Sequence, residues 1–244
     1  MKEKTVKIRN RDFLTFGFPI QKKHLIAALF GLPVERYTRK IQEPVVIGGL
    51  IALFVAVHIV GSLYGLDQFV KAFGFIANDW GRNFFLTAVY AFFMHGSWMH
   101  LLGNSYYFYH FGDDVEHDLG LGLTAVLLFG AHFAGIGLEV LLGSHQDIPM
   151  IGASGGIAGI LGYYMIRLPK RQISYMLFFF VVWIHVPVLM AFVWKFFWEM
   201  IIASTGLSVG VAHWAHLGGM LFGVTFALLM GPKANLRIQK GESQ

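Results

Sequence analysis

Long apolar runs alternate with short polar stretches along most of this 244-residue chain. A run of about 20 apolar residues is long enough to cross a hydrocarbon core of about 30 Å as a helix. A closed β-barrel would not show runs this long. We therefore expect an all-α, polytopic membrane protein with six spanning helices, at about residues 44–64, 98–111, 119–142, 154–168, 173–203 and 211–230.

The polar stretches divide the chain into three parts. Residues 1–43 are polar and basic, apart from a short apolar patch that suits an interfacial helix, and predict a cytoplasmic N-terminal segment. Residues 44–231 form the membrane domain, and 232–244 a cytoplasmic tail. Within the domain, residues 65–97 mix charges with aromatic side chains, which predicts a long loop partly sunk in the outer leaflet.

Composition supports a membrane protein. Hydrophobic residues make up 56% of the chain and charged residues 14%, against about 45–50% and about 25% in soluble domains. The chain has no cysteine, which excludes disulfides, thiolate metal sites and a cysteine nucleophile.

The basic residues predict the orientation of the helices. Ten of the 19 lysines and arginines precede Pro44, and two further groups follow spans four and six: Arg167, Lys170, Arg171, and Lys233, Arg237, Lys240. With six spans all three groups lie on one side, which the positive-inside rule makes cytoplasmic. The net charge of +5 is therefore a topology signal first and an attraction to anionic membrane lipids second; it does not indicate nucleic-acid binding.

Polar side chains gather near the predicted outer ends of three spans. Such residues are costly in a bilayer and are functional candidates by default. The three groups are His95, His100 and Asn104 in "HGSWMHLLGN", Ser154 in "GASGG", and His213 and His216 in "AHWAHLGG".

Glycines indicate how two of these groups meet. Glycines four residues apart let membrane helices approach closely. Three such pairs lie at the starts of spans four and six: Gly152 and Gly156, Gly155 and Gly159, Gly219 and Gly223. If these faces pack spans four and six together, Ser154 lies beside His216, where an imidazole can accept the hydroxyl proton. The helix start at Ser154 offers backbone N–H groups to an oxyanion, and His100 and Asn104 can supply further donors.

The three motifs resemble the signature motifs of rhomboid intramembrane serine proteases: GxSG around Ser154, HxxxN from His100 to Asn104, and AHxxGxxxG from Ala215 to Gly223. The resemblance covers about residues 44–231 and implies a six-helix bundle. It implies that Ser154 is the nucleophile and His216 the general base of a dyad without a third acidic member.

The same resemblance assigns supporting roles and no cofactor. It implies that His100 and Asn104 stabilise the oxyanion together with Ser154, and that His95 has a structural or hydrating role. The supporting glycines are Gly152, Gly155, Gly219 and Gly223.

The sequence departs from the family in two places. A Trp-Arg pair of the first external loop is replaced by Trp80 and Arg82, separated by glycine and far from His95, so neither receives a role. The aromatic residue that stacks on the catalytic histidine is replaced by Ala158, and we expect Trp214 or a span-five aromatic to substitute.

These observations predict a serine endopeptidase of a bacterial inner membrane that cleaves transmembrane protein substrates near the outer end of their helix. A catalytically inactive rhomboid-like binder and a histidine-lined transporter are the alternatives. The His213–His216 pair has metal-ligand spacing, but no carboxylate accompanies it within its span, so we expect no metal. The sequence leaves the natural substrate and the oligomeric state open.

Overall fold

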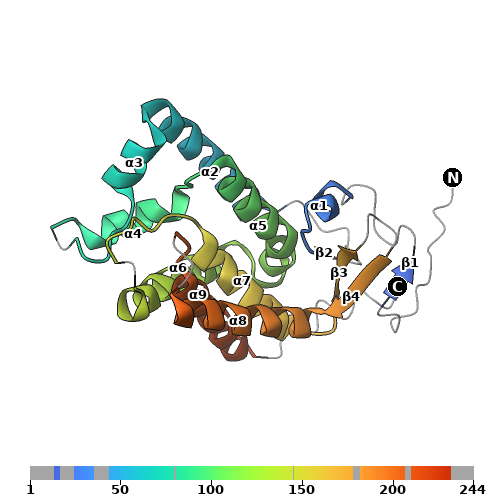
Figure 1. Cartoon of the computed structure of the whole chain (residues 1–244). Helices are drawn as coiled ribbons and strands as arrows, with labels where there is room; N and C mark the ends of the chain where they lie inside the picture. The colour runs from blue at the N-terminus through green and yellow to red at the C-terminus, as the bar shows by residue number, and fades with distance from the viewer. Residues whose placement is uncertain are drawn as a thin grey trace. The chain divides into compact units, whose positions relative to one another are not determined.

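The computed structural model describes residues 14–16, 25–35, 44–79, 81–144, 146–177, 182–206 and 210–231. The chain divides into two compact units. Figure 1 shows the helices and strands, coloured by residue number from the N-terminus to the C-terminus. The smaller unit comprises Met1–Arg39 and Lys170–Ala191, and the larger comprises Lys40–Pro169 and Phe192–Gln244. Each unit has its own cluster of buried apolar side chains.

Helices dominate the larger unit. They are α2 (Val45–Tyr64), α3 (Leu66–Phe73), α4 (Phe84–Phe93), α5 (Trp98–Leu119), α6 (Leu121–Leu142), α7 (Ser154–Arg167), most of α8 (Val188–Thr205), and α9 (His213–Leu229). Among the described residues, α2, α6 and α8 are long and apolar enough to cross a membrane. An integral membrane protein, mostly helical, is thereby confirmed, whereas the predicted count of six spanning helices is not.

Helix α7 lies at the centre of the larger unit, and nearly all of its residues are buried. Its Gly155 and Gly159 meet Gly219 and Gly223 of α9 so closely that a Cβ on either α9 glycine would collide with a backbone carbonyl of α7. This is the contact that the glycine spacing predicts. Gly156 behaves differently, because it faces Leu128 O of α6 rather than α9.

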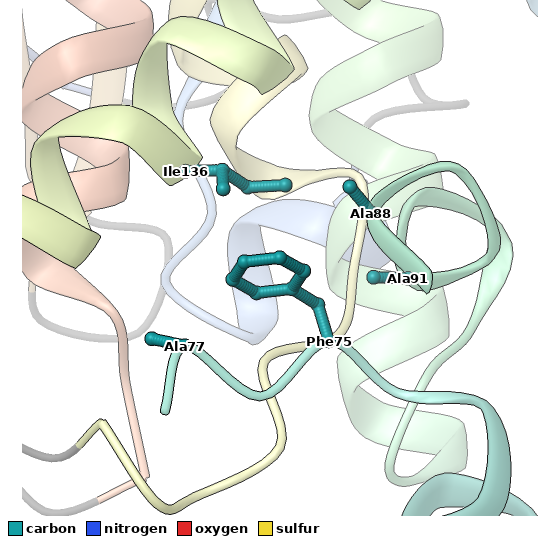
Figure 2. Close-up of a cluster of buried hydrophobic side chains, with 5 residues drawn as sticks. All are labelled: Phe75, Ala77, Ala88, Ala91 and Ile136. Atoms are coloured by element: carbon teal, nitrogen blue, oxygen red, sulfur yellow. The ribbon is translucent and has the colours of Figure 1, made fainter. Parts of the chain in front are cut away.

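The predicted loop at 65–97 is largely helical, because α3 and α4 lie within it. Phe75, between these helices, exchanges backbone hydrogen bonds with Met150 at 3.1 and 2.7 Å. Its ring lies in a buried cluster with alanines of the same loop and an isoleucine of α6, shown in Figure 2: Phe75, Ala77, Ala88, Ala91 and Ile136. The loop is therefore tied to the chain that leads into α7.

The acidic residues after Phe111 are part of α5, which continues two turns beyond the predicted end of the span. Three of them carry buried contacts: Asp114, Glu116 and Asp118. Glu116 accepts hydrogen bonds from the first N–H groups of α2, at Val45, Val46 and Ile47 (2.7, 3.0 and 3.0 Å). Asp118 pairs with Arg167 of α7 at 3.3 Å, with both side chains at least 95% buried.

The smaller unit holds an antiparallel four-stranded sheet in the order β1-β4-β3-β2. Its elements are β1 (Leu14–Phe16), α1 (Leu25–Leu29), β2 (Val34–Glu35), β3 (Gln172–Leu177) and β4 (Val182–Pro187). The all-α prediction missed this sheet. The predicted fifth span, 173–203, is a β-hairpin followed by α8, because its first half is rich in β-branched and aromatic residues.

Candidate active site

Ser154 is the first residue of α7, and a sharp turn precedes it. Gly152 adopts a φ of +113°, in a region that side chains rarely occupy, and its N–H donates to Ala91 O of α4 at 2.7 Å. Ser154 is partly exposed, and the first N–H groups of α7 have no partner within the helix. The turn therefore presents a hydroxyl together with the backbone N–H groups of a helix start.

His100 and Asn104 of α5 lie against this turn. A Cβ on Gly152 would lie 2.8 Å from His100 Nε2 and 3.4 Å from Asn104 Nδ2. The structure thus brings both side chains within two residues of Ser154, as the i, i+4 spacing on one helical face predicts. A side chain at 152 would displace the His100 ring and would be strained at this φ.

His95 supports this arrangement from the segment before α5. Its Nε2 accepts a hydrogen bond from Asn104 Nδ2 at 3.0 Å, which orients the amide. His58 of α2 in turn bonds the carbonyl oxygen of His95 through Nδ1, also at 3.0 Å. His95 therefore lies beside Asn104 and contributes to its placement.

His216 lies in the first turn of α9, on the helix that packs on α7. Ala215 O is 3.6 Å from the Cβ position of Gly155, so the residues next to His216 and Ser154 in sequence touch. Among the described hydrogen bonds none joins the Ser154 hydroxyl to the His216 ring. The start of α9 is held by Glu139 of α6, whose carboxylate accepts from Ala215 N at 3.1 Å.

Glu199 of α8 is a functional candidate that our sequence reasoning missed. Its Oε2 accepts from Nδ1 of His213 at 2.6 Å and from Nδ1 of His216 at 3.2 Å. Its Oε1 accepts from Lys195 Nζ at 2.7 Å, one turn earlier on the same helix. The available sequence signal is a Lys–Glu pair four residues apart within an otherwise apolar helix.

The same three residues are a possible metal site, since one ligand atom from each of Glu199, His213 and His216 lies within 4.8 Å of the others. The reason for expecting no metal was the lack of a carboxylate in the span of the two histidines. That reason does not hold in three dimensions, because α8 supplies the carboxylate.

The structure also describes two positions at which the sequence departs from the family motifs, Ala158 and Arg82. Ala158 is buried in α7, and in the described ring contacts His216 meets His213 but neither Trp214 nor an aromatic of α8. Arg82 caps α3 by donating to the carbonyl oxygens of Lys71 and Ala72 at 2.8 and 3.2 Å. Trp80 lies outside the described residues.

A small cavity of about 30 Å³ lies beside the turn before Ser154. Its lining includes Gly152, Gly155, Ala215 and His132. A cavity of this size can hold a water molecule.

Comparison with known proteins identifies the family of the chain. A family model described as "Rhomboid domain" matches residues 82–233, more than half of the chain and a range that includes every candidate residue from His95 to Gly223. The rhomboid protease GlpG of Photorhabdus laumondii subsp. laumondii is 29% identical over 140 residues, covering 55% of this chain and 44% of that protein. The chain therefore aligns with less than half the length of that relative.

Proposed function

Because this chain belongs to the rhomboid family, we propose that it is an intramembrane serine endopeptidase that acts on transmembrane protein substrates. The observation that carries the proposal is the glycine contact between α7 and α9, which brings the turns holding Ser154 and His216 together. The similarity to a rhomboid protease supports the same activity.

In this reaction Ser154 attacks the carbonyl carbon of the scissile peptide bond. Its proton passes to Nε2 of His216, and the carbonyl electron pair moves onto oxygen. His100, Asn104 and the N–H of Ser154 stabilise that oxyanion. When the tetrahedral intermediate collapses, the His216 proton goes to the departing amine, and a water molecule then hydrolyses the acyl-enzyme by the same path in reverse order.

The substrate must expose its backbone before this attack. A transmembrane helix has all its N–H and C=O groups bonded internally, so the segment at the site must unwind locally. We infer a preference for small or helix-breaking residues near the outer end of the substrate helix. The substrate class is therefore defined by a transmembrane helix that unwinds readily near its outer end.

The test compares the unaltered chain with Ser154→Ala and His216→Ala, purified in detergent, on a reporter transmembrane substrate. We expect both substitutions to abolish cleavage while thermal unfolding is unchanged. A fluorophosphonate probe should label the unaltered chain and not Ser154→Ala. Equal cleavage by all three proteins would overturn the proposal, and a folded, unlabelled, inactive chain would favour the inactive binder.

The orientation we infer places the starts of α7 and α9 at the outer face and both termini in the cytoplasm of a bacterial cell, with α2 and α5–α9 as the six spans. Because the chain has no cysteine, single cysteines report on it cleanly. A membrane-impermeant maleimide should label Thr205→Cys in intact cells, and Lys170→Cys only after permeabilisation. Both side chains belong to exposed residues, so the reverse pattern would invert the topology.

A further inference from the structure

We propose that Glu199 is an acidic positioning residue for His216, so that the site works as a serine–histidine–glutamate set rather than a pair. The inference rests on the proposed protease function and adds a third member to it. The juxtaposition that carries it is Glu199 Oε2 on α8 at 3.2 Å from His216 Nδ1 on α9.

The contact selects one tautomer of His216. An ionised carboxylate only accepts hydrogen bonds, so Nδ1 of His216 must carry the proton. The other ring nitrogen, Nε2, then keeps its lone pair, which is the form that a general base requires. Without an acceptor at Nδ1 the two tautomers compete, and the fraction of competent base falls.

The charge of Glu199 acts at the next step. When the Ser154 proton reaches Nε2, the ring becomes a cation, and the carboxylate stabilises it across the Nδ1–H bond while the proton stays on Nδ1. Glu199 is 5% exposed, and this screening from water strengthens the interaction. The ammonium group of Lys195 donates to the other carboxylate oxygen at 2.7 Å and adds a positive charge on that side.

Glu199 also accounts for the missing aromatic at 158. In the family resemblance a ring on the fourth helix holds the catalytic histidine, and here that position is Ala158. A hydrogen bond from α8 holds the His216 ring instead. His213 donates to the same oxygen at 2.6 Å, which keeps the carboxylate directed at α9.

A metal ion at Glu199, His213 and His216 would use the same donor atoms. It would take the Nδ1 lone pair of His216 and repel the Lys195 ammonium, which lies 2.7 Å from the carboxylate. The N···O distances of 2.6 and 3.2 Å are those of hydrogen bonds. The observations therefore favour a hydrogen-bonded cluster, and metal binding becomes an outcome of the test.

The experiment measures kcat, KM and thermal unfolding of Glu199→Gln in the full chain with the reporter substrate. Glutamine keeps the size of the side chain and removes its charge. We expect kcat to fall about 10- to 100-fold, the range for a hydrogen bond to a charged group. We expect KM to stay within about twofold, because the contact lies on the base rather than on the substrate.

Two matched variants separate positioning from structure. Lys195→Gln and His213→Gln each remove one other partner of Glu199 and leave the His216 contact in place, so we expect each to lower kcat less than Glu199→Gln does. A parallel loss of kcat and of melting temperature in all three variants would overturn the proposal in favour of a structural cluster.

Three further outcomes are decisive. Full kcat in Glu199→Gln, with the unaltered chain active, would overturn the positioning role and leave the protease function intact. Absence of cleavage and of fluorophosphonate labelling in the unaltered chain would overturn both. Activity that EDTA removes and Zn²⁺ restores would assign the cluster to a metal.

Discussion

The glycine contact between α7 and α9 yields a quantitative prediction for Gly219→Ala. A Cβ at Gly219 would lie 2.9 Å from the carbonyl carbon of Gly155 and closer still to its oxygen. Both atoms are backbone, so neither can rotate away as a flexible side chain would. The two helices must separate by about an ångström to restore van der Waals contact.

This separation has two consequences of different size. Overpacking in a well-packed core costs about 1–3 kcal/mol, which corresponds to a fall in melting temperature of roughly 2–12 °C for a chain of this length. A misplacement of about 1 Å between reacting groups costs about 10²-fold in rate. We therefore expect Gly219→Ala to remain folded, with a modestly lower melting temperature, and to cleave the substrate about 100-fold more slowly.

The assay is thermal unfolding in detergent together with cleavage of the reporter substrate. Gly137→Ala in α6 is the matched control, because nothing lies within 4 Å of its Cβ position; it should keep both activity and melting temperature. Unchanged activity and stability in Gly219→Ala would show that α7 and α9 are not in contact at this point, and would refute the reasoning.

Three other substitutions test separate contacts. Gly152→Ala places a side chain at a φ of +113° and against His100, so we expect cleavage to fall at least about 100-fold with fluorophosphonate labelling reduced in step; normal kinetics would contradict the close approach. Glu116→Ala leaves the first N–H groups of α2 without their acceptor and should lower the free energy of unfolding by about 1–3 kcal/mol, measured by denaturant unfolding, with kcat unchanged. Arg167→Met strands the buried Asp118 charge and should cost about 3–5 kcal/mol, while adding Asp118→Leu should recover most of it; no recovery in the double variant would argue against the pair.

Much of the candidate site follows from spacing alone. His100 and Asn104 share a helical face because they are four residues apart, and the structure finds both beside Gly152. Gly155 and Gly159 meet Gly219 and Gly223 because small residues at that spacing form a flat stripe on each helix. These are local regularities, and any helix built from these residues would have them.

The parts that were missed depend on residues distant in sequence. From the sequence alone, Glu116 cannot be distinguished from the acidic residues around it, because its contact with the start of α2 joins segments that are far apart in the chain. The strands β3 and β4 were predicted to be part of a membrane helix, because apolar content alone does not distinguish a buried strand from a membrane span. The predicted span had 31 residues, which is longer than a helix needs to cross a bilayer.

The amino-acid order alone determined the apolar runs, the membrane character and the three motifs, because each depends on periodicity within one segment. Only the tertiary structure decided that a carboxylate of α8 would meet the histidines of α9, since Glu199 and His216 lie on different helices. Local patterns define the face that each helix presents, whereas the packing of whole helices decides which faces meet.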